Sequence, residues 1–158
     1  MMKKIKWTDL LLFVVGTELV GFLSSLVSGS DFREHYASMS KPPLSPPALV
    51  FPIAWGILFA LMGISAYLVY SAEHRLRRRA LTLYFGQLFV NFLWTPVFFG
   101  IESFVGAVIV ILVLLVLVAA MTAVFYHVRP LAAYINIPYL LWTVYATYLT
   151  IGFAILNS

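Results

Sequence analysis

Five long stretches of apolar residues constrain the fold of this chain more than any other feature. A helix needs about 20 mostly apolar residues to cross the hydrocarbon core of a bilayer. The stretches that meet this length lie at residues 10–28, 49–71, 80–100, 104–126 and 131–156. Because backbone amides find no water in the bilayer core, each stretch is expected to be helical. The sequence therefore predicts one domain, residues 1–158, that is an all-α integral membrane protein built as a five-transmembrane-helix bundle.

The composition supports a membrane location and excludes several classes of function. Of the 158 residues, 63% are hydrophobic and 10% are charged, and the mean hydropathy is +0.98. A soluble domain carries about 25% charged residues, so this chain cannot cover a water-facing surface. The sequence has no cysteine, no phosphate-binding loop, no catalytic triad and no cluster of metal ligands. We therefore expect no metal site, no cofactor and no nucleic-acid partner, and enzymatic activity is left open.

Lysine and arginine gather at one end of the predicted helices. Eight of the ten lie in the N-terminal segment or in the second and fourth connections, whereas Arg33 and Lys41 lie in the first external loop, residues 29–48. Basic residues are retained on the cytoplasmic side of a membrane. The pattern predicts a cytoplasmic N-terminus and an external C-terminus, in a bacterial cell membrane. The arginine cluster at 75–79 is interpreted as this topological signal, with binding of anionic lipid as the alternative.

The first external loop is rich in proline. Four of the eight prolines lie within residues 42–47, directly before the second span. Each proline fixes its own φ and pushes the preceding residue towards extended conformations. We expect a stiff, extended strap that forms a lid over the outer mouth of the bundle, with Pro46 and Pro47 against a bound ligand. The alternative is a simple end of one helix and start of the next.

Polar and aromatic side chains at membrane depth predict an interior binding site. Amides and an indole on the third span are spaced by four and three residues and so share one helix face, and further indoles lie on the second and fifth spans. The candidates are Trp55, Gln87, Asn91, Trp94, Trp142 and Ala146. Where such faces converge, planar apolar ligands stack on the indoles and the amides orient them. The alternative is that the tryptophans form an interfacial belt and the amides join helices.

Glu18 is the one acidic residue well inside a predicted span. A charge at the centre of the bilayer costs roughly 2.5–3.5 kcal/mol on insertion scales, so such a carboxylate is a functional candidate. Gly21 and Ser25 share its helix face. Glu18 is expected either to hydrogen-bond a neighbouring helix as a neutral acid or to bind protons or a cationic ligand. The second role would suit a proton-coupled transporter of lipophilic cations.

Several short motifs resemble those of a known family. They are PPLSPP at 42–47, FPIAWG at 51–56, NFLW at 91–94, PVFFG at 96–100 and PYLLW at 138–142. Together they resemble the TspO/MBR family of translocator proteins, also called peripheral benzodiazepine receptors, over about Tyr36 to Ala154. One position departs from the family pattern, because Leu44 stands where an aromatic residue is usual.

The resemblance implies a function as well as a fold. It implies a membrane protein that binds porphyrins and other tetrapyrroles, sterols or benzodiazepine-type ligands beneath the first external loop, as a stress-related sensor or carrier. Trp55, Asn91, Trp94, Trp142 and Ala146 match pocket positions of the family, with Gln87 on the same lining face. Trp55 and Trp142 also match tryptophans associated with light-driven porphyrin breakdown, which is an alternative function. Homodimers are common in the family.

Overall fold

The computed structural model describes residues 4–28 and 32–157. Within these residues the chain is helical, and no strand occurs. The elements are α1 (Trp7–Ser28), α2 (Phe32–Ser38), α3 (Val50–Tyr70), α4 (Arg77–Thr95), the π-helical η1 (Pro96–Gly100), α5 (Phe104–Val128), α6 (Pro130–Ile135) and α7 (Ile137–Asn157). Five segments are long and apolar enough to cross a membrane: α1, α3, α4 with η1, α5, and α6 with α7. The predicted all-α bundle with five membrane-spanning segments is confirmed.

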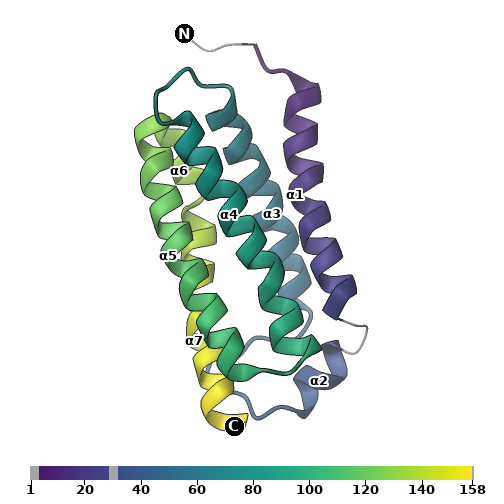
Figure 1. Cartoon of the computed structure of the whole chain (residues 1–158). Helices are drawn as coiled ribbons and strands as arrows, with labels where there is room; N and C mark the ends of the chain where they lie inside the picture. Colours follow the sequence, from purple (N-terminus) through teal and green to yellow (C-terminus); the bar gives the residue numbers. More distant parts are fainter. Residues whose placement is uncertain (1–3, 29–31, 158) are drawn as a thin grey trace.

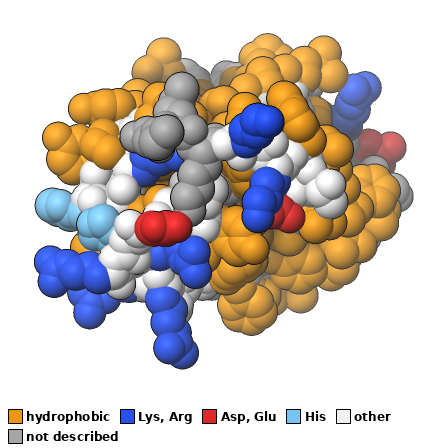
Figure 2. Space-filling model, turned by 90° about the horizontal axis from the view of Figure 1, so that it is seen from above, with side chains coloured by type: hydrophobic (Ala, Val, Ile, Leu, Met, Phe, Trp, Pro, Cys, Tyr) orange, Lys and Arg blue, Asp and Glu red, His pale blue; other side chains and the backbone are white. Residues whose placement is uncertain are grey.

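The two ends of the bundle differ in character. The start of α1 and the connections α3–α4 and α5–α6 lie at one end, here called the basic end, whereas α2, the proline-rich segment and the C-terminus lie at the other, the strap end (Figure 1). Figure 2 looks onto the basic end and shows lysine and arginine side chains gathered there, with hydrophobic side chains around them. Between the two ends, α1 packs on α3 and α4, while α5 packs on α4, α6 and α7.

The loop predicted over residues 29–48 is more structured than the sequence suggested. Part of the predicted loop 29–48 forms the short helix α2, and residues 29–31 lie outside the described residues. The proline-rich segment, residues 40–47, is called the strap below. It is not extended throughout, because the chain turns at Pro43 and Leu44, where Leu44 has a φ of 68°. The hydroxyl of Ser45 holds this turn by donating to the carbonyl of Pro42 at 2.7 Å.

The fifth span consists of two helices rather than one. Helix α6 ends at Ile135 and α7 begins at Ile137, so Asn136 lies between them. Pro138 explains the break, because proline has no backbone N–H and disfavours helical conformation in the residue before it. The Asn136 amide donates to Ser65 Oγ at 2.6 Å, and Ser65 Oγ donates to the Ala132 carbonyl at 2.8 Å. The break is thereby tied to α3.

Helix α4 widens where Pro96 interrupts it. The backbone N–H of Ile101 donates to the Pro96 carbonyl at 3.0 Å, five residues back, which is the π-helical pattern. Such π-helical insertions are frequent at functional sites. Here the insertion places Phe98 and Phe99 in the buried interior of the bundle, next to the tryptophans of the candidate site.

Candidate ligand-binding site

Tryptophans from α3, α4 and α7 meet in one aromatic cluster. The rings of Trp55 and Trp142 contact each other edge to face, with centroids 6.2 Å apart. Trp94 stacks on Phe98 at 5.2 Å, and Phe51 meets Trp142 edge to face at 6.2 Å. Aromatic rings favour such offset and perpendicular arrangements at centroid distances of about 4.5–7 Å. The three indoles predicted as candidates therefore come from separate spans and lie in one part of the bundle.

The aromatic cluster encloses only a very small inner void. Its volume is about 10 Å³, and it is bordered by Trp55, Trp94, Trp142 and Ala146. A void of this size holds at most one water molecule. The sequence predicted an open cavity at the centre of the bundle, but aromatic side chains fill that position. The fillers include Phe98 and Phe153, whose rings meet edge to face at 5.6 Å.

Open space lies instead on the α1 side of the cluster. A cavity of about 400 Å³, here called the side chamber, lies between α1, α3, α4 and η1. Its lining includes Glu18, Asn91, Trp55 and Trp94. The side chains that border both the inner void and the side chamber are Phe51, Trp55, Trp94 and Phe99. This aromatic wall therefore separates a closed space from an open one.

The surroundings of three glycines show where α1 touches the bundle and where it stands away from it. A Cβ atom added at Gly63 would lie 2.6 Å from the Cα of Val14, so α1 and α3 are in backbone contact there. A Cβ at Gly21 would lie 2.3 Å from the ring of Phe59. At Gly56, two turns before Gly63 on α3, a Cβ would meet nothing within 4 Å. Gly56 borders the side chamber, and because glycine has no side chain the chamber stays open at this position.

A buried hydrogen-bond network joins α4 to α7. The Tyr139 hydroxyl donates to Gln87 Oε1 at 2.6 Å and accepts from Asn91 Nδ2 at 2.7 Å. Gln87 and Tyr139 are fully buried, and Gln87 borders neither cavity. Tyr139 was not among the residues singled out from the sequence. A phenol within an apolar span needs a hydrogen-bond partner, and two amides four residues apart on another span were the available signal.

Two indole N–H groups in the aromatic cluster have no partner. Among the described residues, Trp94 Nε1 and Trp142 Nε1 are buried and make no hydrogen bond. Most buried polar atoms in proteins do have a partner, so each exception calls for an explanation. Both indoles border the inner void, and Trp94 also borders the side chamber. An acceptor atom on a bound molecule would satisfy these donors.

The strap is fastened to α7. The Tyr148 hydroxyl donates to the Pro43 carbonyl at 2.6 Å, and the Asn157 amide exchanges hydrogen bonds with the backbone of Ser40 at 2.8 and 2.9 Å. Pro42 packs on Gly152, where an added Cβ would lie 2.6 Å from the proline ring. These contacts hold the strap against α7, and a role of the strap as a lid stays a prediction, because none of its residues borders the inner void.

Pro46 and Pro47, which were expected to contact a ligand, are the last two residues of the strap. The Tyr36 hydroxyl donates to the Pro46 carbonyl, and Tyr36 borders the inner void. Burial raises the pKa of the Tyr36 hydroxyl above its usual value. Pro46 is half-buried and Pro47 is exposed, and neither borders the inner void or the side chamber. Their contact with a ligand stays a prediction.

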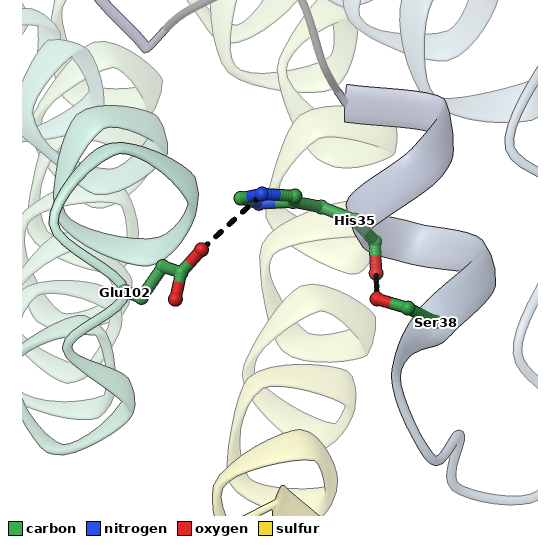
Figure 3. A network of polar contacts seen from close by, with 3 residues as sticks. All are labelled: His35, Ser38 and Glu102. Carbon is green, nitrogen blue, oxygen red and sulfur yellow. Dashed lines mark hydrogen bonds and ion pairs between the residues drawn. The ribbon is translucent and has the colours of Figure 1, made fainter.

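A surface ion pair joins α2 to the loop between η1 and α5. His35 Nε2 lies 3.2 Å from Glu102 Oε1, and the Ser38 hydroxyl donates to the His35 carbonyl at 2.9 Å (Figure 3). The backbone of Glu102 has a φ of 53°, an uncommon value for this residue type. The side chains of His35 and Glu102 are 40% and 60% exposed, so their attraction is weakened by water.

Comparisons with known proteins agree with this architecture. The model of the TspO/MBR family matches residues 13–156. The chain is 34% identical to the translocator protein of Homo sapiens over 144 residues, which cover 89% of this chain and 85% of the relative. It is 40% identical to the tryptophan-rich sensory protein of Cereibacter sphaeroides over 72% of this chain and 71% of that one, and 30% identical to the tryptophan-rich protein TspO of Archaeoglobus fulgidus over 88% and 90%. The resemblance noted in the sequence is thus confirmed, and the chain belongs to the TspO/MBR family.

Proposed function

We propose that this protein is a membrane receptor or carrier for tetrapyrroles such as porphyrins, acting in a stress response without obligatory turnover. Sterols and benzodiazepine-type molecules are further candidate ligands of the same site. The proposal agrees with the name tryptophan-rich sensory protein given to the relative from Cereibacter sphaeroides.

The observation that carries the proposal is the aromatic wall together with two unpartnered indole donors, one in the wall and one beside it. Trp55 and Trp94 offer apolar ring surface towards the side chamber, on which a planar macrocycle can stack. The N–H groups of Trp94 and Trp142 are buried without an acceptor among the described residues. Tetrapyrroles combine a large flat apolar face with carboxylate or carbonyl acceptors at their edge. The wall therefore supplies the two kinds of contact that such a ligand needs.

The two cavities suggest how binding proceeds. The side chamber has a volume of about 400 Å³, within the range of about 300–1,000 Å³ that small-molecule sites occupy. A ligand can therefore begin to bind against Trp55 and Trp94 without rearrangement. Aromatic rings leave almost no free volume in the inner void. A ligand can therefore occupy it only if Phe98 or Phe153 changes rotamer, or if the strap moves away from α7.

A porphyrin titration of the purified protein tests this proposal. Trp142→Ala and Asn91→Ala are each expected to weaken porphyrin binding about fivefold or more, equivalent to about 1 kcal/mol, measured by the absorbance change of the porphyrin. Trp7→Ala is the matched control, because Trp7 lies near the N-terminus and is 66% exposed. Equal affinity of the wild type and both site variants would show that the ligand binds elsewhere.

A second candidate function is light-dependent breakdown of a bound porphyrin. The edge-to-face contact of Trp55 and Trp142 favours it, because two indoles beside a photosensitising macrocycle can be oxidised in light by dioxygen. Trp55→Phe and Trp142→Phe are then expected to slow porphyrin loss under light while binding in darkness persists. Loss at an equal rate in these variants would remove the tryptophans from the reaction.

We also propose a cytoplasmic basic end, an external strap end, a bacterial cell membrane and a homodimer. The gathering of Lys and Arg at the basic end supports the orientation. Labelling from either side of sealed vesicles, with single cysteines introduced at Ser40 and at His74, tests it. Cross-linking at low protein concentration tests the dimer, and a solely monomeric species would exclude it.

A further inference from the structure

The side chamber contains a carboxylate that the tetrapyrrole proposal does not use. Glu18 lies on α1, is half-buried and borders the side chamber together with Gly21 and Ser25. It does not border the inner void. Within residues 4–28 and 32–157 the structure assigns its carboxylate neither a hydrogen bond nor an ion pair. The residues that border the chamber include no lysine, arginine or histidine.

The surroundings of Glu18 suit an organic cation. A carboxylate within a membrane span is costly, and an opposite charge beside it offsets part of that cost. The chamber is also lined by aromatic rings, because Trp55 and Phe59 both border it, stacked on each other with centroids 5.5 Å apart. Aromatic faces attract ammonium groups, most strongly where water is excluded. The negative charge and the ring faces therefore favour the same class of ligand.

The rim of the side chamber faces the bilayer. Phe22, which borders the chamber, is 58% exposed, and the neighbouring rim residues Ser25 and Pro52 are exposed as well. All three belong to membrane-spanning helices, so their exposed surfaces face lipid or the lipid headgroups on the strap side. A molecule that partitions into the bilayer can thus reach Glu18 without crossing the strap.

From these observations we propose that the side chamber is a binding site for amphipathic aromatic amines, with Glu18 as the counter-ion of the protonated or quaternary nitrogen. The aromatic body of the ligand lies against Trp55 and Phe59, and the ligand enters from the bilayer. This site does not depend on the tetrapyrrole proposal. A tetrapyrrole stacked on the same wall has to keep its acidic edge away from Glu18, whereas an amine gains from this charge, so the two ligand classes are distinguished by their response to Glu18→Gln. Proton-coupled transport stays a prediction from the sequence.

A matched pair of probes isolates the charge. The first is the naphthylmethyl trimethylammonium ion, and the second is neopentylnaphthalene, an uncharged molecule of nearly the same shape. Binding to the protein in phosphatidylcholine nanodiscs is measured by equilibrium dialysis, with empty nanodiscs subtracted. We expect Glu18→Gln to weaken binding of the cation about tenfold, because one partner of a charge pair is lost. Binding of the neutral probe is expected to stay within about twofold of the wild type.

Two further variants complete the experiment. Asp9→Asn removes an equal charge from the same helix but outside the chamber, and it is expected to leave binding of the cation unchanged. Gly56→Leu places a side chain in the chamber and is expected to abolish binding of both probes. Equal affinity of the cation for the wild type and Glu18→Gln, or for the wild type and Gly56→Leu, would overturn the proposal. Porphyrin binding by Glu18→Gln is measured in parallel, so a failure of the tetrapyrrole proposal appears separately.

Discussion

The two sides of the aromatic wall are packed very differently. On the α7 side, the rings of Trp142, Phe98 and Phe153 leave a void of about 10 Å³, and the strap is hydrogen-bonded to α7. On the α1 side, the same wall borders a chamber of about 400 Å³. One side of Trp55 and Trp94 therefore borders almost no free volume, while the other borders open space.

The difference follows from what holds helices together in a bilayer. Lipid tails are as apolar as leucine, so no hydrophobic force closes a gap between two membrane helices. Contact arises where polar groups bond or where small residues allow close approach. Helix α7 is joined to α4 through Tyr139, Gln87 and Asn91, whereas α1 meets α3 in backbone contact at Gly63. A small residue permits close approach but does not enforce it, because at Gly56 nothing lies within 4 Å of an added Cβ and the space remains open.

The largest predicted effect tests the contact that fixes α1. Gly63→Ala forces a methyl group to within 2.6 Å of the Val14 Cα, so α1 must move away. We expect a loss of about 3 kcal/mol, at the upper end for overpacking. Gly56→Ala is the matched control on the same helix, expected to be neutral or to stabilise by up to about 1 kcal/mol through helix propensity. Unfolding by SDS in mixed micelles measures both, and equal losses would refute the contrast.

The next effect concerns the polar network on the closed side. Tyr139→Phe removes the hydroxyl that pairs with Gln87 Oε1 and Asn91 Nδ2, and leaves both amides buried. Leaving buried polar groups unpaired costs about 1–3 kcal/mol, so we expect a loss of about 2 kcal/mol in the same unfolding assay. Tyr134→Phe is the control, because Tyr134 is 60% exposed and its replacement should change the stability very little. If both variants unfold alike, the network does not hold α4 to α7.

A smaller effect is expected at the strap. Gly152→Ala places a Cβ 2.6 Å from Pro42, which should displace the strap from α7 at a cost of about 1 kcal/mol. Limited proteolysis at Lys41 should accelerate, and a ligand that reaches the inner void should dissociate faster. Binding of the naphthylmethyl trimethylammonium ion to the side chamber should not change. A parallel change in that affinity would mean that the two sides of the wall are coupled.

The smallest effect is expected at the ion pair that links α2 to the loop after η1. His35→Ala removes a contact between two side chains that are 40% and 60% exposed. Exposed pairs of this kind contribute about 0–1 kcal/mol and are screened by salt, so the loss should shrink further at high ionic strength. Proteolysis at Lys41, measured at low and high salt, is a sensitive readout of the strap end. A large increase in proteolysis that persists at high salt would mean that α2 holds the strap end more strongly than its contacts indicate.

The sequence predicted which types of residue gather at the site more accurately than it predicted the shape of the cavity. Trp55, Trp94 and Trp142 were identified because they lie on helix faces that could converge and offer indole rings for stacking, and they do lie around one void. Their function as ligand contacts stays a prediction. Gln87, expected on a cavity lining, is instead bonded within the core to Tyr139. Helical spacing indicates which residues share a face, but it does not indicate what the opposite helix places against that face.

The sequence by itself determined that the chain crosses a membrane five times, and it indicated where the basic end lies and to which family the chain belongs. These properties depend on the composition of each segment and on short motifs, which are local. Only the tertiary structure decided that the centre is filled, that open space lies beside α1 and that Tyr139 joins α4 to α7. Such features depend on contacts between distant segments: Gly63 and Gly56 both lack a Cβ atom, yet α1 touches α3 at the first and open space lies at the second.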